Sequence, residues 1–464
     1  MFLPRSRLVD LRDRISGSYW FLPSIMFLGA LALALGTLRI DIFLDRSDAL
    51  STSPWFPKFG ADASRSILST LASGMLTVTG VVFSLTIVAL QLGSSQFGPR
   101  LLRTFMNSRG TQVVLGTFTS SFIYYLLVMG SVRGDIGFVP QISTATGVFL
   151  GMLDIAVLIY FVHHLATSIR IESVLATVSD EVRDVIDALY PSGIGDERDQ
   201  QPETDWKDVV AASEGFRVRA EEAGYIRQID SKALMSTACE HDLLLRVELQ
   251  PGAFVLDGGV LLTVWPDSAV SDDARERLRK SAVLGPDRTP GQDVGFAIRQ
   301  LVEVALRALS PGINDPYTAV ECTNRLAEAL CVAARRRRPQ AERRDETGRV
   351  RVIAEAMRLP AMARTAFAPI ARAGGGNGDV AVRVLESLVT IAACARDADD
   401  RRVLIDFAGE LARQMQSQLT LERDRRAVGE RFHSAMQALG DREPDGTEGS
   451  DTKDLPLALQ GDAV

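Results

Sequence analysis

Small and hydroxyl side chains recur along one face of a long apolar segment. Between Ser66 and Pro99 the sequence has no charged residue, and its polar positions are three, four or seven apart, which places them on roughly one face of a helix. They are Thr70, Ser73, Thr77, Gly80, Ser84 and Gln91. Hydroxyl and amide oxygens can replace part of an ion's hydration shell, so this face is a candidate pore wall. The alternative is close helix packing, which the same residue types favour.

Asp154 is a second candidate for ion chemistry. It lies between Leu153 and Ile155 in another apolar segment, and an ionisable group at that depth in a bilayer usually faces a partner or a water-filled cavity. We name it as a further pore-lining candidate, next to the alternative of a hydrogen-bonded carboxyl group that fastens two helices.

Residues 301–326, LVEVALRALSPGINDPYTAVECTNRL, predict a helix, a tight turn and a second helix. Asp315 suits the N-cap of the second helix and Pro316 its first position. Local folding chemistry explains the motif, and Asn314 and Asp315 are also candidate ligand-binding residues at the turn.

Catalytic and metal-binding patterns do not stand out in the sequence. The four cysteines form no CxxC pair and the four histidines no HExxH motif, so we expect neither a metal site nor a cofactor. The only carboxylates that merit testing lie near the central motif: Glu303, Asp315 and Glu321. We therefore expect no enzyme.

The charge divides unequally along the 464 residues. Residues 1–169 contain 12 Lys and Arg against 8 Asp and Glu, whereas the rest contains 39 against 50. This division excludes a single soluble globule, and the net charge of −7 argues against a nucleic-acid binder. The acidity belongs to the second part of the chain.

Four segments are long and apolar enough to cross a hydrocarbon core of about 30 Å. These predicted spans are Trp20–Leu38, Ile67–Leu92, Gln112–Val132 and Thr144–Ile169. The first is too long for a typical signal peptide and is expected to remain as an anchor. Lysines and arginines number seven on one side and five on the other. This bias, together with the unpaired cysteines of the acidic domain, predicts that both termini are cytoplasmic.

The chain is expected to leave the membrane as a helix over residues 170–190. Its apolar residues recur at heptad spacing: Ile171, Leu175, Val178, Val182, Val185 and Leu189. Such a seam suits either packing on the cytosolic domain or a coiled coil around an oligomer axis. A polar linker over residues 191–208 should follow.

Residues 209–270 predict a small β-rich module. The expected strands are Phe216–Ala220, Gly224–Asp230, Leu243–Leu249 and Phe254–Trp265, with a helix over Ser231–His241. The hairpin PGAFVLDGGVLLTV is similar to those of biotinyl and lipoyl modules but has no lysine at its tip, so no swinging-arm cofactor is expected. Residues 271–438 should form a helical cytosolic domain, and residues 439–464 a disordered acidic tail.

Two motifs carry a family resemblance. VVFSLTIVALQLGSSQFGPRLLRTF, over Val81–Phe105, and RALSPGINDPYTA, over Arg307–Ala319, resemble the bacterial predicted membrane proteins of domain of unknown function 2254. The resemblance covers nearly the whole chain. It implies four spans in the bacterial inner (plasma) membrane and a cytosolic domain, and it carries over no activity.

The expected fold is therefore an α-helical integral membrane protein of four transmembrane helices, with a cytosolic α+β domain that contains a small β module and a helical bundle. Its expected function is that of a homo-oligomeric channel or ion-transport protein with a cytosolic regulatory domain. The expected partners are the lipid bilayer and inorganic ions, with no nucleic acid. The alternative is a membrane-anchored sensor or scaffold whose cytosolic domain binds a ligand or partner.

Overall fold

The computed structural model describes residues 20–47, 59–97, 109–132, 138–168, 170–190, 206, 210–211 and 213–440. The chain forms two compact units that divide between Val174 and Leu175. We call them the N-terminal unit and the C-terminal unit and describe each by itself.

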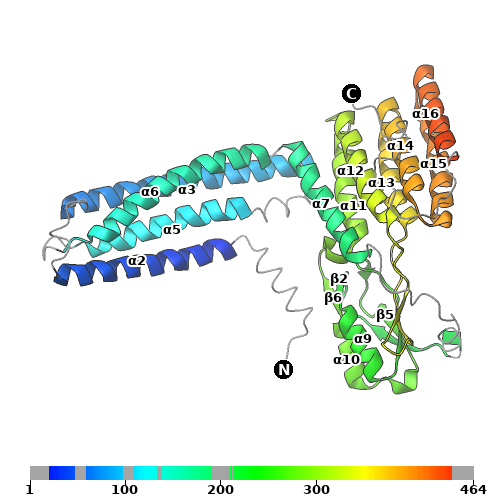
Figure 1. Cartoon of the computed structure of the whole chain (residues 1–464), viewed down its shortest axis with the longest axis horizontal. Coiled ribbons are helices and arrows are strands. Elements are labelled where there is room, and N and C mark those ends of the chain that lie inside the picture. Colours follow the sequence, from blue (N-terminus) through cyan, green and yellow to red (C-terminus); the bar gives the residue numbers. More distant parts are fainter. Residues whose placement is uncertain are drawn as a thin grey trace. The chain divides into compact units, whose positions relative to one another are not determined.

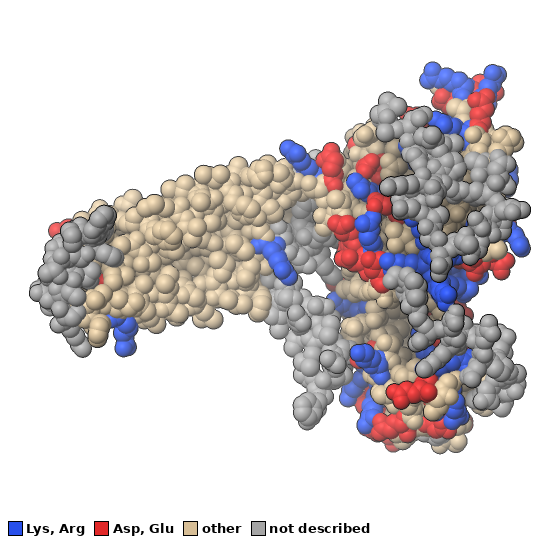
Figure 2. Space-filling model, viewed as in Figure 1, with Lys and Arg blue, Asp and Glu red and all other residues tan. Residues whose placement is uncertain are grey.

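Four long helices form the N-terminal unit (Figure 1). They are α2 (Phe21–Ser47), α3 (Ala61–Phe97), α5 (Arg109–Ser131) and α6 (Gln141–Ser168). Each is long and apolar enough to cross a membrane. Helix α5 packs against each of the other three and is the most buried. The expected four-helix composition is confirmed, and the surface of these helices in Figure 2 is almost free of charged residues between their ends.

Two of the helices extend well past the predicted spans. Helix α2 continues from Leu38 to Ser47, and α3 begins at Ala61 rather than Ile67. The added turns contain charged residues that hydropathy excluded from the spans, but Asp41 and Arg65 are hydrogen-bonded to the ends of neighbouring helices. These contacts allow charged side chains within the helices.

Two sheets form the β part of the C-terminal unit. The larger one has the order β1 (Phe216–Arg219), β5 (Val260–Trp265), β3 (Leu244–Val247), β8 (Val350–Ile353) and β7 (Glu342–Arg344). All its neighbours are antiparallel except β3 and β8. The smaller sheet has the antiparallel order β4 (Phe254–Val255), β2 (Gly224–Ile229) and β6 (Ala282–Gly285).

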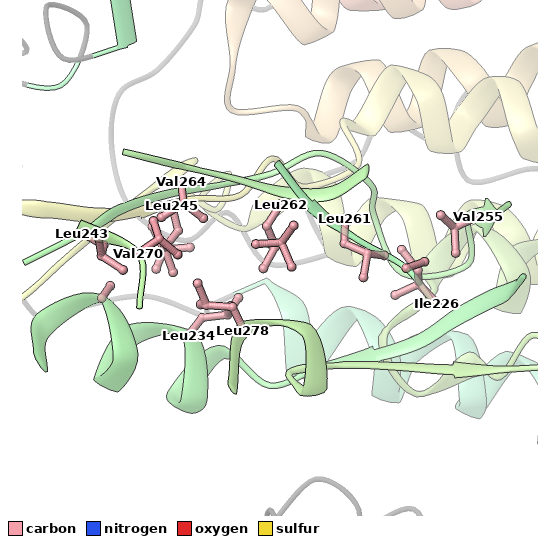
Figure 3. Close-up of a cluster of buried hydrophobic side chains, with 14 residues drawn as sticks. Ile226, Leu234, Leu243, Leu245, Val255, Leu261, Leu262, Val264, Val270 and Leu278 are labelled. Atoms are coloured by element: carbon pink, nitrogen blue, oxygen red, sulfur yellow. The ribbon is translucent and has the colours of Figure 1, made fainter. Parts of the chain in front are cut away.

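One apolar core joins these sheets to two helices, α9 (Ser231–Glu240) and α10 (Asp272–Lys280). Leu234 of α9 and Leu278 of α10 face the strand residues Leu245, Leu262 and Val264 (Figure 3). Strand β5 can lie between β1 and β3 inside the larger sheet because residues 261–265 are all buried.

Six further helices complete this unit (Figure 1). They are α11 (Val294–Ala308), α12 (Pro316–Arg335), α13 (Leu359–Gly374), α14 (Gly378–Cys394), α15 (Ala398–Gln418) and α16 (Glu422–Gly440). Four of them begin at an Asp or Asn whose side chain accepts a backbone N–H of the first turn. These N-caps are Asp293, Asp315, Asn377 and Asp397.

The segment expected to be helical from residue 271 also contains three strands. Strand β6 completes the smaller sheet, and β7 and β8 extend the larger one. In addition, the strand predicted over Phe254–Trp265 is divided into β4 and β5 by a turn at Gly258, whose φ is +72°. The predicted helix Ser231–His241 is confirmed as α9.

Helix α7 (Ile171–Leu189) confirms the helix predicted over residues 170–190. Leu175, Val178, Val182 and Val185 of its seam are buried within this one chain. Arg183 pairs with Glu328 of α12, and Asp187 pairs with Arg336 just after α12. The seam therefore packs on the C-terminal unit. The predicted linker 191–208, except Trp206, lies outside the described residues, as does the predicted tail 439–464 beyond its first two residues, which end helix α16.

Candidate functional site

Asp154 is fully buried between α5 and α6. Its Oδ1 accepts a hydrogen bond from the Ser121 hydroxyl at 2.8 Å, and its Oδ2 accepts one from the Tyr125 hydroxyl at 2.8 Å. The two donors are one turn apart on α5, so both face the same carboxyl group. A carboxyl group held in this way fastens two helices, which is the second of the two readings that the sequence left open.

Two glycines of α6 lie in close contact with α3. A Cβ on Gly151 would lie 2.8 Å from Leu71 Cδ2, and one on Gly147 would lie 3.0 Å from Leu68 Cδ2. Because they are four residues apart, Gly147 and Gly151 share one helix face and let α3 approach α6. The small residues that bring α3 close to its own chain are therefore on α6 and not on the polar face of α3.

A second polar cluster lies where α6 begins. The carboxylate of Asp41 on α2 accepts the backbone N–H groups of Ile142 and Ser143 at 2.8 and 2.9 Å and the Ser143 hydroxyl at 2.6 Å. It thus supplies an N-cap from another helix, and its negative charge is favourable beside the helix N-terminus. Tyr124 donates to Ser143 O at 3.0 Å and also contacts the Thr37 hydroxyl at 3.2 Å.

Two further side chains form hydrogen bonds to backbone groups at the same end of this unit. Arg65 donates to Val132 O, just after α5, at 2.7 Å. Gln141 accepts from Phe59 N and donates to Phe59 O, both at 2.8 Å. Sequence reasoning missed this cluster because Asp41, Phe59 and Gln141 lie outside the predicted spans. A charged or amide residue at each of three neighbouring helix ends could have indicated the cluster, but the predicted spans did not reach these residues.

The polar face of α3 points away from the other described helices of the N-terminal unit. Thr70, Ser73, Thr77, Gly80, Ser84 and Gln91 are all exposed. The residues of α3 that pack on the other helices are Ser64, Leu68, Ala72, Met75, Val82 and Thr86. At 100° per residue, the centres of these two faces are about 165° apart. Helix packing within one chain therefore does not account for the polar face.

Hydrogen bonding divides the polar face into two groups. Thr70 and Thr77 donate to the carbonyl oxygens one turn earlier, at 2.8 and 3.0 Å. Ser84 and Gln91, by contrast, have no side-chain hydrogen-bond partner among the residues that the structure describes. A Cβ on Gly80 would have no atom within 4 Å, so this part of the face is open.

The six pore-lining candidates thus form no single site within the chain. Five of them share the exposed face of α3, whereas Asp154 lies inside the bundle with Ser121 and Tyr125. The face of α3 is the candidate functional surface, and Asp154 belongs to the framework that positions α5 and α6.

The turn between α11 and α12 has the predicted local chemistry. The Asp315 carboxylate accepts the Thr318 N–H at 3.1 Å and the Thr318 hydroxyl at 2.6 Å, and Pro316 is the first residue of α12. Asn314 is exposed and has a φ of +50°, which asparagine tolerates better than most residues. Capping and turn formation account for both candidate ligand-binding residues.

The remaining candidate carboxylates do not converge on one another. Glu321 pairs with Arg325 at 3.2 Å on α12, while Asp315 caps that helix. Glu303 lies on α11 and also has an interaction within the chain. Among the described residues, no group of three His, Cys, Asp or Glu side chains is arranged to hold a metal ion.

Four of the eight arginines between residues 335 and 351 pair with carboxylates among the described residues: Arg336, Arg344, Arg349 and Arg351. Arg351 bonds Asp345 at 2.7 Å and Asp242 at 2.6 Å, and only 9% of the Arg351 and Asp345 side chains is exposed. Hydrogen bonds from Thr347 and Arg351 hold the pKa of Asp345 well below its usual range. The hydrogen bond from Arg351, together with the charge of nearby Arg349, lowers the pKa of Asp242.

Comparison with known proteins identifies relatives but no activity. An uncharacterized protein of Mycobacterium bovis and one of Mycobacterium tuberculosis are each 31% identical to this chain over 424 residues. The match covers 90% of this chain and 80% of each relative. No solved structure matches the chain. A family model described as a predicted membrane protein, domain of unknown function 2254, matches residues 16–390, and the chain therefore belongs to that family.

Proposed function

We propose that the chain assembles into a homo-oligomeric membrane channel or ion-transport protein in which the polar faces of α3 surround a common axis. The observation that carries this proposal is the exposure of that face, about 165° from the surface that α3 uses within its own chain. Such a face favours contact with a second copy of the chain or with water along the axis of the oligomer.

The cost of leaving the face in lipid supports assembly. Helix α3 has 37 residues and is about 55 Å long, so it exceeds a hydrocarbon core of about 30 Å. Ser84 falls within the apolar part of the helix, where an unsatisfied polar group costs several kcal/mol in hydrocarbon. Gln91 lies two turns further on and suits the mouth of a pore. Four helices of one chain rarely enclose a pore, so several copies would be required.

The neutral side chains of this face fit ion passage. Hydroxyl and amide oxygens can replace part of the hydration shell of inorganic ions without binding them so tightly that they fail to leave. Exposed apolar residues flank the polar positions, among them Val81 and Val88, which are 53% and 50% exposed. In the assembly they would provide contacts between copies or narrow parts of the pore.

The C-terminal unit has a mechanical connection through which it would regulate the pore. Only two residues separate the end of α6 at Ser168 from the start of α7 at Ile171. Helix α7 is fastened to the C-terminal unit through Arg183 and Asp187. A rearrangement of that unit would therefore pull on α6.

We place the protein in the bacterial inner membrane with both termini in the cytoplasm. Support comes from the mycobacterial relatives and from the seven-to-five distribution of lysines and arginines around the spans. Four spans put both termini on one side of the membrane. The free thiols of the C-terminal unit suit a reducing compartment.

Ion flux through the purified protein tests the proposal. In liposomes the wild-type protein should conduct inorganic ions, and Ser84→Leu should reduce the flux to about a tenth or less, because an apolar constriction favours dewetting. Leu85→Met is the matched control, since Leu85 is also exposed but lies about 100° from Ser84 around the helix. Ion-impermeable liposomes that contain folded protein would contradict the channel and favour the membrane-anchored sensor or scaffold.

A further inference from the structure

Two cysteine side chains meet where α12 and α14 end. Cys331 lies one turn before the end of α12, and Cys394 is the last residue of α14. The Arg396 N–H donates to Ala334 O at 3.2 Å, so the two helix ends touch through their backbones. The thiols of Cys331 and Cys394 are hydrogen-bonded to each other, and both cysteines are free and partly exposed.

Arg335 lies close to both cysteines and contacts the sulfur of Cys394. It follows Cys331 by four residues, so the two side chains share a helix face, and its Nη2 lies 3.8 Å from Cys394 Sγ. A guanidinium group near a sulfur stabilises the thiolate form. The hydrogen bond to Cys394 and burial raise the pKa of Cys331. The guanidinium group of Arg335 thus faces the Cys394 sulfur, whereas the raised pKa of Cys331 keeps that thiol protonated.

We propose that Cys331 and Cys394 are a peroxide-sensitive pair that closes to a disulfide between α12 and α14. The Cys394 thiolate attacks hydrogen peroxide; the O–O bond breaks and the leaving hydroxide takes up a proton to become water. Cys331 sulfur then attacks the Cys394 sulfenic acid, loses its proton and displaces the second water. Two thiols are oxidised to one disulfide, while one peroxide is reduced to two waters.

The site adjoins the contact that fastens α7. Arg336, the residue after Arg335, donates to Tyr190 O at 2.8 Å and pairs with Asp187. Oxidation removes the sulfur charge that Arg335 faces and links its helix covalently to α14. This modification site stands independently of the proposed channel.

Peptide mapping of the full-length protein in detergent tests the proposal. After exposure to hydrogen peroxide and alkylation of the remaining thiols, mass spectrometry should find a Cys331 to Cys394 linked peptide. Cys239, which is exposed, and Cys322, which is buried on the same helix as Cys331, serve as internal controls. If Cys239 is oxidised and the linked peptide is absent, the proposal is overturned.

Single variants assign the two roles. In Cys331→Ser, Cys394 should accumulate sulfenic acid that dimedone traps, whereas in Cys394→Ser dimedone should leave Cys331 unlabelled. Arg335→Gln should slow disulfide formation about tenfold, the effect of roughly one pKa unit on the thiolate fraction, and Arg335→Lys should restore most of the rate. Equal labelling of the two cysteines, or an unchanged rate in Arg335→Gln, would overturn the assigned mechanism.

Discussion

At the scale of single residues, Asp154 shows how an ionisable group buried between apolar helices can be structural. Both of its oxygens accept hydroxyl hydrogen bonds from α5. These bonds satisfy the carboxyl group without a bound ion. Asp154→Leu would leave the hydroxyls of Ser121 and Tyr125 without their hydrogen-bond acceptor, at a cost of about 1–3 kcal/mol for each hydroxyl. We expect a clearly lower melting temperature in detergent, with a smaller loss in Asp154→Asn.

A double-mutant cycle separates this contact from other effects. Tyr125→Phe combined with Asp154→Leu should destabilise by less than the sum of the two single variants, because they remove the same hydrogen bond. Additive losses of stability would show that Asp154 and Tyr125 do not interact in the folded protein.

The Asp345 carboxylate gives a prediction about pH. Its pKa is lower in the folded protein than in the unfolded chain, so its contribution to stability is present above about pH 4 and is lost as the pH falls further. Asp345→Asn should lower the unfolding midpoint in urea at neutral pH and flatten its decline below pH 4. An acid dependence as steep as that of the wild type would assign the effect to other groups.

At the scale of helices, matched glycine substitutions distinguish the two faces of α3. Gly151→Leu inserts a side chain where a Cβ already lies 2.8 Å from Leu71, whereas Gly80→Leu meets no atom of its own chain. Overpacking typically costs about 1–3 kcal/mol, so Gly151→Leu should lower the melting temperature of the protein and Gly80→Leu should not. Gly80→Leu should instead weaken assembly, which light scattering would detect as a lower mass of the oligomer.

Local signals predicted much of the fold, and long-range pairing accounts for most of what they missed. Hydropathy found all four long helices, and Asp315 with Pro316 marked the start of α12. Strand β7 (Glu342–Arg344) has no apolar pattern, and β8 pairs with β3 more than a hundred residues away. The partner of Asp41 is likewise on another helix. The local periodicity of apolar residues in the sequence does not indicate such long-range contacts.

The candidate site was predicted in its composition and only in part in its geometry. Periodicity correctly grouped Thr70 to Gln91 on one face, because helix geometry alone determines that relation. Whether this face points into the bundle depends on whether other residues of α3 pack more closely against the neighbouring helices. Leu68, Met75 and Val82 supply that packing opposite Gly147 and Gly151, and this choice is made by the tertiary structure.

At the scale of the whole molecule, the proposed pore requires several copies of the chain. In a variant whose native cysteines are replaced by serine, Ser84→Cys should form disulfide-linked dimers under mild oxidation because Ser84 faces another copy or a narrow axis. Leu85→Cys should give fewer. Denaturing gels without reductant measure both, and equal cross-linking would place the contact elsewhere on α3.

The proposed ion pathway is tested most directly by a cysteine scan of α3 with a charged thiol reagent during flux measurement. Modification should block ion flux at Thr77→Cys and Ser84→Cys. It should have little effect at Phe83→Cys and Leu85→Cys, which are exposed positions about 100° to either side of Ser84. A block that does not follow this period, or flux that Ser84→Cys modification leaves unchanged, would contradict the claim that the polar face of α3 lines an ion pathway.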